Sequence, residues 1–317
     1  MMSGMRPMLA TATDHVPPGD GWVHEVKWDG VRVLVDVTEG VTRMFSRNGN
    51  VVTAAWPDLS AAPLGARDLL VDGEVIALND RGIPDFRVLQ HRMHVRKASE
   101  AARLTEQIPA TLMTFDLLRL DGDDLTGRPL AERRELLTGL GLADTLGSIG
   151  TAWQVPASYD DGVMLWDATL QQGLEGVVSK RLTSRYRFDT RSKDWLKRAH
   201  RHRGSYVVGG WRPQVDTTER LAAVLVGEPT ADGLMYRGRV GSGLSGATAR
   251  KLAELLAPLH ADASPFADDV PRVDAQGTTW VEPVVVVDID THGPGYDRLR
   301  QPSFQGVRSD LTAEDLA

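Results

Sequence analysis

The amino-acid sequence predicts an α+β protein of two domains, in which antiparallel sheets with flanking helices precede a C-terminal β-barrel of the OB-fold type. In the first 200 residues, β-branched segments and helical patterns alternate too irregularly for a repeating β-α-β unit. In the remaining residues, short strands and a single helix suit a small, partly open barrel. A length of 317 residues also accommodates two ordinary domains. We therefore expect domains at residues 1–200 and 201–317.

In the first domain, segments rich in β-branched residues are bounded by turn residues. They predict strands at residues 31–37, 69–78, 111–120 and 174–180. Helical composition or helical spacing of apolar residues predicts helices at residues 86–95, 131–140 and 162–172.

The second domain has shorter strands, which we expect at residues 206–211, 221–227, 234–240 and 280–289. One helix is predicted at residues 247–259, because Leu252, Leu255, Leu256 and Leu259 fall on one face. We expect a hinge at residues 198–204, and fraying at residues 312–317.

The composition excludes several classes of protein. The 42% apolar and 25% charged residues are typical of a soluble globular chain, and no run of about 18 apolar residues could span a bilayer. The start of the sequence lacks the apolar core of a secretory signal, so we expect a cytoplasmic protein with no membrane contact. The absence of cysteine excludes disulfides, cysteine zinc sites and thiol nucleophiles. Any essential metal must therefore use oxygen or imidazole ligands.

The net charge of −7 argues against a nucleic-acid partner, but the charge is unevenly distributed. Basic residues are concentrated between residues 180 and 212, where the only acidic residues are Asp189 and Asp194. This block surrounds a candidate active-site strand, which favours phosphate binding over a solvated basic face.

The most specific local pattern is Lys27-Trp28-Asp29-Gly30-Val31-Arg32, a KxDGxR motif just before a predicted strand. A lysine attacks a nucleotide phosphorus only as the free amine, and nearby cations or a metal ion lower its pKa. A turn at Asp-Gly would bring Arg32 back toward the lysine. The alternative is a lysine at a sheet edge followed by a type I′ turn.

Further motifs follow in order along the chain. They lie at residues 46–49 (SRNG), 72–74 (DGE), 115–116 (FD), 174–178 (LEGVV), 195–197 (WLK), 239–245 (RVGSGLS) and 308–310 (RSD). Together with the lysine motif they resemble those of the ATP-dependent DNA ligases. The likeness is strongest to the compact bacterial ligases and to the ligase module of bacterial end-joining ligase proteins. It extends over nearly the whole chain and implies a nucleotidyltransferase domain followed by an OB-fold.

The resemblance implies a role for each matched residue. Lys27 would be the catalytic nucleophile that accepts AMP. The other expected nucleotide-binding residues are Glu25 on the adenine side, Arg32, Arg47, Glu74 at the ribose or a metal, Phe115 stacked on adenine, Arg191, and Lys197 at the α-phosphate. Glu74 and Glu175 are the expected metal ligands, and Arg308 and Asp310 would orient the leaving group.

The implied reaction uses ATP with a divalent metal, Mg²⁺ or Mn²⁺, and carboxylate ligands suit such an ion. AMP passes from ATP to Lys27, then to the 5′-phosphate of a nick, and leaves when the 3′-hydroxyl attacks. The expected partner is nicked double-stranded DNA, with end-joining or repair proteins as further candidates, and we expect a monomer.

Two departures from the family pattern remove positive charge: Ala199 and Leu311 stand where family members usually or often carry lysine. An NAD-dependent ligase is disfavoured because 26 residues before Lys27 leave no room for its nicotinamide domain. RNA ligases and RNA-capping guanylyltransferases share the lysine motif and remain alternatives. A catalytically silent OB-fold nucleic-acid binder is the alternative from another class.

Overall fold

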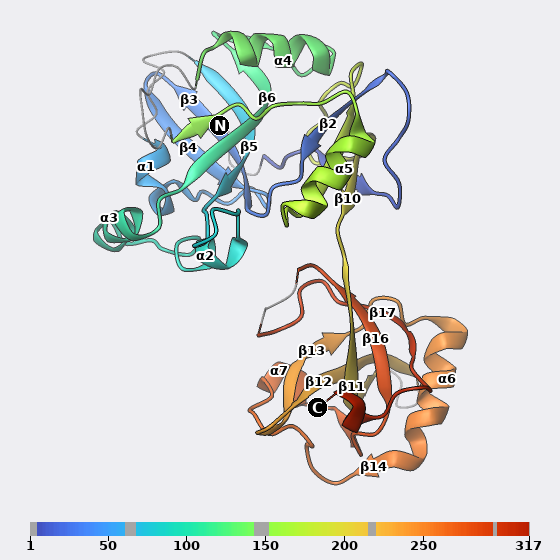
Figure 1. The fold of residues 1–317 in the computed structure, drawn as a ribbon. Helices are drawn as coiled ribbons and strands as arrows, with labels where there is room; N and C mark the ends of the chain where they lie inside the picture. Colours follow the sequence, from blue (N-terminus) through green and yellow to red (C-terminus); the bar gives the residue numbers. More distant parts are fainter. Residues whose placement is uncertain (1–4, 61–67, 143–151, 215–219, 294–296, 317) are drawn as a thin grey trace. The chain divides into compact units, whose positions relative to one another are not determined.

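A computed structural model describes residues 5–60, 68–142, 152–214, 220–293 and 297–316. The chain divides into two compact units, Met1–Ala199 and His200–Ala317, and each is described by itself. Both units combine helices with mainly antiparallel sheets, as the predicted α+β class requires (Figure 1).

The larger sheet of the first unit has the strand order β4-β3-β5-β6-β7, and β8 pairs with β6. These strands are β3 (Val31–Thr38), β4 (Val41–Ser46), β5 (Leu69–Ile76), β6 (Thr111–Leu120), β7 (Asp123–Asp124) and β8 (Trp153–Gln154). All neighbours are antiparallel except β6 and β8. Strand β3 is buried on both faces, because Val33 and Val35 enter one core cluster and Leu34 enters another.

The smaller sheet has the order β1-β10-β9-β2. Its strands are β1 (Leu9–Ala12), β2 (Trp22–Val26), β9 (Gly176–Arg181) and β10 (Arg191–Ala199). A core cluster joins the two sheets and consists of Met8, Leu34, Phe45, Leu70, Phe115, Leu118, Tyr186 and Trp195. Because β2 and β3 belong to different sheets, the lysine motif is the segment that crosses between them.

The helices of the first unit are η1 (Thr53–Ala55), α1 (Pro57–Ser60), α2 (Phe86–Gln90), α3 (Ala98–Gln107), α4 (Leu130–Gly139) and α5 (Gly162–Gln171). Aspartates cap the N-termini of two of these helices. The Asp85 side chain accepts the N–H of Arg87 in α2, and the Asp161 side chain accepts the N–H groups of Val163 and Met164 in α5. Helix α4 packs on β6, and α5 packs beside β2 and β9 (Figure 1).

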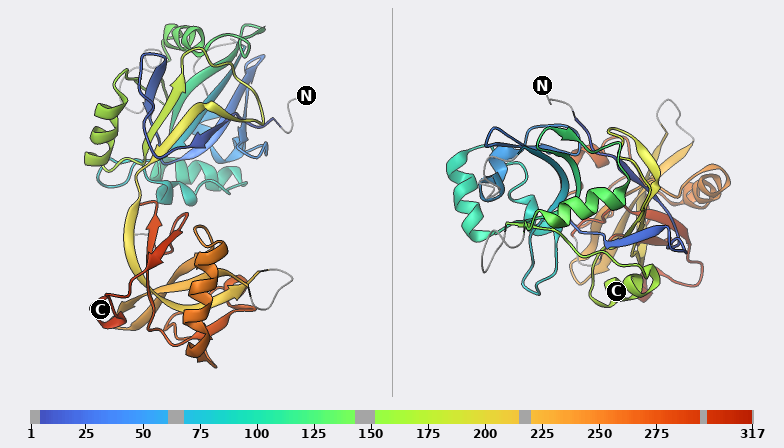
Figure 2. Two further views of the ribbon diagram at one scale, coloured as in Figure 1. Left: turned by 90° about the vertical axis from the view of Figure 1, so that its right-hand side faces the viewer. Right: turned by 90° about the horizontal axis from the view of Figure 1, so that it is seen from above.

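The second unit contains a seven-stranded antiparallel sheet centred on the long strand β11 (His202–Pro213). The other strands are β12 (Leu221–Thr230), β13 (Gly233–Val240), β14 (His260–Ala261), β15 (Thr279–Val281), β16 (Val286–Thr291) and β17 (Ser303–Val307). Figure 2 shows helix α6 (Gly246–Leu256) lying against the strands of this unit. The helix buries Ala249, Leu252 and Leu256 in the core of the unit. The remaining helices are η3 (Ala257–Leu259), α7 (Arg272–Ala275) and η4 (Ala313–Leu316).

Three predicted elements need correction. The helix expected at residues 86–95 ends at Gln90, and the chain turns where the Arg92 side chain is buried. The strand expected at residues 280–289 is two strands, β15 and β16, separated by a segment that contains Pro283, which has no N–H to donate. The helix expected at residues 247–259 changes to a 3₁₀ turn before Pro258.

Candidate active site

Three contacts position the lysine motif, residues 27–32, within the first unit. The backbone N–H of Lys27 donates to the carbonyl of Gly176 at 2.8 Å, which extends the β2–β9 pairing. A carboxylate oxygen of Asp29 accepts the N–H of Phe86 at 3.2 Å, at the start of α2. Gly30 lies so close to β5 that a Cβ would be 2.2 Å from the carbonyl oxygen of Val75. Gly30 does not have a positive φ, so the loop is a bend rather than a type I′ turn.

The Lys27 amine forms an ion pair with Glu175, and both side chains are largely buried, at 18% and 13% exposure. Glu74 on β5 belongs to the same electrostatic cluster. Burial, together with the charges of Glu175 and Asp72, raises the pKa of Glu74 to about 8, although Arg32 and Lys27 act in the opposite direction. The structure therefore brings the lysine and both predicted metal ligands together.

Lys197 on β10 adds positive charge to this cluster. Burial lowers its pKa, and the nearby charges of Lys27, Arg47 and Arg191 lower it further. The Arg191 guanidinium is anchored through a 2.6 Å hydrogen bond to the carbonyl of Ala10. A group of cations gathered beside the lysine is suited to a polyanionic ligand such as a triphosphate.

Arg32 is held by Asp72, which belongs to the motif at residues 72–74, and through it by Tyr186, which the sequence did not single out. Its guanidinium donates to both oxygens of Asp72, at 2.6 and 2.7 Å, and Tyr186 donates its hydroxyl to the same carboxylate at 2.6 Å. Burial and the charge of Asp72 raise the pKa of Tyr186 well above its usual value, so the phenol stays a donor. The Arg32 guanidinium lies 4.7 Å from the centre of the Phe115 ring.

Phe115 and Glu25 define a second part of the site. The Phe115 ring packs edge-on against Trp195, with centroids 6.3 Å apart. The amine of Lys180, on β9, lies 4.2 Å from the centre of the Phe115 ring and 2.7 Å from a Glu25 oxygen. Arg134, on α4, forms an ion pair with the other oxygen of Glu25. Lys180 had appeared in the sequence only as part of the basic block, and Arg134 carried no signal.

The donor set near Lys27 fits a hard divalent cation. Among the described residues, no group of three or more histidine, cysteine or carboxylate side chains could hold a metal alone. Magnesium, however, is usually bound by one or two carboxylates together with substrate phosphates and water. Glu74 and Glu175 suit that mode of binding. Burial is the main cause of the raised pKa of Glu74, and a bound cation would favour its charged form.

Comparison with known families decides the identity of this arrangement. The family model described as "ATP dependent DNA ligase domain" matches residues 7–198, and the one described as "ATP dependent DNA ligase C terminal region" matches residues 217–311. The chain belongs to the ATP-dependent DNA ligase family. The first match includes Lys27 and the other site residues of the first unit, the second includes Arg308 and Asp310, and together they confirm the family predicted from the motifs.

Two relatives of this chain are longer proteins. The "Multifunctional non-homologous end joining DNA repair protein LigD" of Mycobacterium tuberculosis H37Rv is 36% identical over 318 residues, covering 98% of this chain and 39% of that protein. The Pseudomonas aeruginosa "Multifunctional non-homologous end joining protein LigD" is 33% identical over 328 residues, covering 100% and 37%. The chain thus spans about two fifths of the length of these curated relatives.

A solved structure has the same fold as this chain. The "mycobacterial DNA ligase D complexed with ATP and MES" has a TM-score of 0.55 and 34% identity, and the match covers 99% of this chain and 98% of that chain. The predicted fold class, nucleotidyltransferase sheets followed by an OB-fold, is confirmed.

The residues predicted to orient the leaving group, Arg308 and Asp310, lie in the second unit. Arg308 donates to both oxygens of Asp310, at 2.9 and 2.7 Å, and its third nitrogen lies 3.4 Å from Asp288. The hydrogen bond to Asp310 raises the pKa of Arg308, and the same bond lowers the pKa of Asp310 to about 2. Arg308 is therefore held within its own unit. In the described part of the chain, no helix is long and apolar enough to cross a membrane.

Proposed function

We propose that this chain seals nicks in double-stranded DNA, using ATP and a covalent lysyl-AMP intermediate at Lys27. The observation that carries the proposal is the grouping of Lys27 with Glu74, Glu175 and Lys197 in a member of the ATP-dependent DNA ligase family. A nucleophilic amine, two carboxylates for a cation and a further phosphate-binding cation are what nucleotidyl transfer requires.

In the first step, the unprotonated Lys27 amine attacks the α-phosphorus of ATP. A phosphorus–nitrogen bond forms, the bond to the β-phosphate oxygen breaks, and pyrophosphate leaves. Lys197, Arg47 and Arg191 would neutralise the triphosphate, and Arg308 with Asp310 would orient the pyrophosphate. Glu175, the ion-pair partner of Lys27, is placed to hold the amine before ATP arrives.

In the second step, an oxygen of the DNA 5′-phosphate attacks the lysyl-AMP phosphorus, which releases the lysine and forms an adenylated end. In the third step, the 3′-hydroxyl attacks the 5′-phosphorus of the DNA, and AMP departs as the phosphodiester bond forms. The same group of cations serves each step, because every transition state develops negative charge on phosphoryl oxygens.

The nucleoside part of ATP would lie along the other half of the site. We assign Glu25 and Phe115 to the adenine and Arg32 to the nucleotide, with Asp72 and Tyr186 orienting its guanidinium. Glu74 and Glu175 would hold a divalent ion, Mg²⁺ or Mn²⁺, which would neutralise phosphate charge when bound.

We also propose a role in DNA repair, since relatives named for non-homologous end joining match nearly the whole chain. End-joining or repair proteins are the proposed protein partners, and we propose that the chain acts as a monomer in the cytoplasm. The family match disfavours an RNA ligase or an RNA-capping guanylyltransferase.

Incubation with ATP labelled at the α-phosphate tests the proposal. The wild-type chain should acquire an acid-labile label with Mg²⁺ or Mn²⁺ present, because phosphoramidate bonds hydrolyse in acid, and peptide mapping should locate the label on Lys27. Absence of label with intact DNA binding would favour the catalytically silent binder, and a label acquired from GTP alone would favour a capping enzyme.

A further inference from the structure

A buried group of charges lies beside Phe115, formed by Glu25, Lys180 and Arg134. Glu25 is 4% exposed, and each of its oxygens has one cationic partner: Arg134 for one and Lys180 for the other. A buried carboxylate is stable only when its charge is compensated and its lone pairs are bound. The two cations therefore determine where the carboxylate points.

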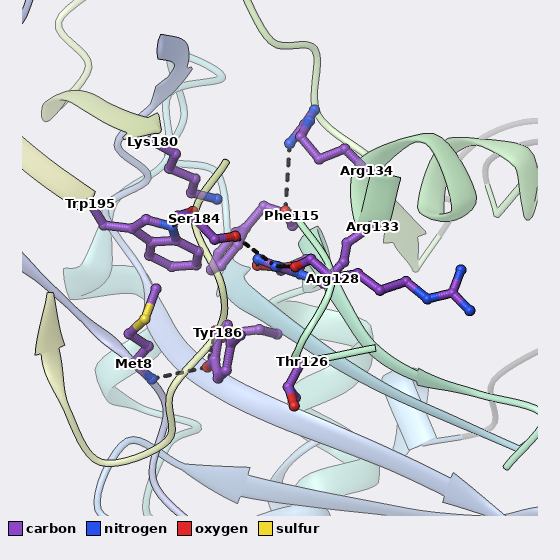
Figure 3. Close-up of polar contacts among 12 residues, drawn as sticks. Met8, Phe115, Thr126, Arg128, Arg133, Arg134, Lys180, Ser184, Tyr186 and Trp195 are labelled. Atoms are coloured by element: carbon purple, nitrogen blue, oxygen red, sulfur yellow. Dashed lines mark hydrogen bonds and ion pairs between the residues drawn. The ribbon is translucent and has the colours of Figure 1, made fainter. Parts of the chain in front are cut away.

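Of these two cations, Arg134 is the one anchored to the backbone. Its guanidinium donates to the carbonyl of Phe115 at 3.5 Å (Figure 3). It also donates to the carbonyl of Pro156 at 3.3 Å and forms the ion pair with Glu25. These partners lie on or beside three elements, β2, β6 and β8. A planar guanidinium with several donors can hold this geometry, whereas a lysine amine cannot.

Lys180 has a different environment. Its amine lies over the rings of Phe115 and Trp195, at 4.2 and 4.3 Å from their centres (Figure 3). Burial lowers the pKa of Lys180, and the charges of Glu25 and Asp116 oppose this shift. An amine on a flexible stem is a poor anchor for a carboxylate, so the orientation of Glu25 depends chiefly on Arg134.

We propose that Arg134 is a positioning residue for nucleobase selection: it holds Glu25 as a fixed acceptor for the exocyclic amine of a purine. The inference rests on the proposed function, in which the base lies beside Glu25 and Phe115. An ionised carboxylate only accepts hydrogen bonds, so it pairs with the 6-amino group of adenine and repels the 6-oxo group of hypoxanthine. Discrimination of this kind depends on a buried polar group that cannot move to a new partner.

The prediction concerns the ratio of two substrates rather than activity alone. Wild-type chain should label itself faster with ATP than with inosine triphosphate. Arg134→Ala should reduce this ratio about tenfold or more, because a hydrogen bond to a charged group contributes roughly that much to binding. The effect should lie mainly in KM for ATP, with a smaller change in the maximal rate. Arg134→Lys, which keeps the charge but not the planar donors, should also reduce the ratio.

The matched control is Arg128→Ala, which removes an exposed arginine just before α4. It should leave the ratio unchanged. Circular dichroism and thermal unfolding identify any variant that fails to fold, in which case Arg134→Lys provides the measurement. A third substrate, purine riboside triphosphate, lacks the 6-substituent and should discriminate less between wild type and Arg134→Ala than ATP does.

The possible outcomes separate the two proposals. If wild-type chain is not labelled by ATP, the proposed function fails, and this inference fails with it. If the wild type is labelled but Arg134→Ala and Arg134→Lys slow all three nucleotides equally, Arg134 is structural and the inference alone is overturned. The same conclusion follows if the wild type does not distinguish ATP from inosine triphosphate.

Discussion

At the scale of single residues, buried ion pairs position the side chains of the site. Asp72 and Tyr186 hold Arg32. Arg133, on α4, donates to both oxygens of the fully buried Asp116, on β6, at 2.8 Å. Losing one partner of such a pair leaves an uncompensated buried charge, which commonly costs about 3–5 kcal/mol. The exposed Arg308–Asp310 pair contributes far less to stability, because solvent screens it.

The sequence predicted the residues that lie within motifs, but not their partners. The lysine motif and the glutamates of residues 72–74 and 174–178 are local patterns, and the structure brings Lys27, Glu74 and Glu175 together. Arg134 and Tyr186 lie far along the chain from Glu25 and Asp72. Only the fold brings such residues into contact, so no pattern along the chain could indicate their roles.

One prediction at this scale concerns acid stability. His24 is buried, with its Nδ1 atom 2.8 Å from the Ser179 hydroxyl, and burial lowers its pKa while Asp161 and Asp160 oppose the shift. The folded chain thus binds the proton more weakly than the unfolded chain, so stability is complete above the ordinary histidine pKa of about 6.5 and is lost as the pH falls below it.

We expect His24→Asn, which keeps a polar side chain but cannot titrate, to weaken this dependence. The melting temperature of the wild type should fall more steeply between pH 7 and pH 5 than that of the variant, as measured by thermal unfolding. Parallel curves for the two chains would show that His24 does not contribute to the acid response.

At the scale of elements, the crossing of the chain between two sheets creates the site. The strand at residues 111–120 was predicted with its observed bounds, because a mainly apolar run bounded by turn residues is typical of a buried strand. The polar strand β10 and helix α3, in which only Ala101 and Leu104 are buried, were not predicted. Hydrogen-bonded pairing with β9 and β1 stabilises β10, although most of its residues are polar or charged.

Gly176, at the start of β9, provides a prediction for this scale. Its φ is +142°, and a Cβ there would lie 2.2 Å from the carbonyl oxygen of Arg198 on β10. We expect Gly176→Ala to lower the free energy of unfolding by about 2 kcal/mol or more, from backbone strain and the clash with β10. Because the Gly176 carbonyl also accepts the Lys27 N–H, self-adenylation should slow as well.

Urea denaturation measures this loss. Gly127→Ala is the control, because a Cβ at that glycine would have no atom within 4 Å. Equal stability of the two variants would contradict the close approach of β9 and β10.

At the scale of the whole molecule, the two units contribute different groups to the proposed reaction. The first unit holds the proposed nucleophile and the cations proposed to bind phosphate, while Arg308 and Asp310 belong to the second. The proposed role of Arg308 at pyrophosphate requires the units to change position about residues 198–204 between steps. Arg308 must also exchange Asp310 or Asp288 for phosphate oxygens.

We therefore expect Arg308→Ala to slow self-adenylation by about a hundredfold or more, the usual cost of removing a cation from a phosphoryl-transfer site. Sealing of a nick that already carries AMP should be much less affected, because no pyrophosphate leaves in that step. Single-turnover rates of the two reactions provide the comparison. Arg250→Ala, which removes an exposed arginine of α6 in the second unit, is the control, and equal losses in both steps by Arg308→Ala would count against the role.

The most direct test of the central claim, that Lys27 carries AMP, uses two DNA substrates with one variant. Lys27→Ala offers no nucleophile, so it should neither take label from ATP nor seal an ordinary nick. It should still seal a nick that already carries AMP on its 5′-phosphate, at least in part, because that step needs no lysyl-AMP. Lys97→Ala, which removes an exposed lysine before α3, should behave as the wild type in both assays. Self-labelling by Lys27→Ala at the wild-type level, with normal sealing of the ordinary nick, would contradict the account.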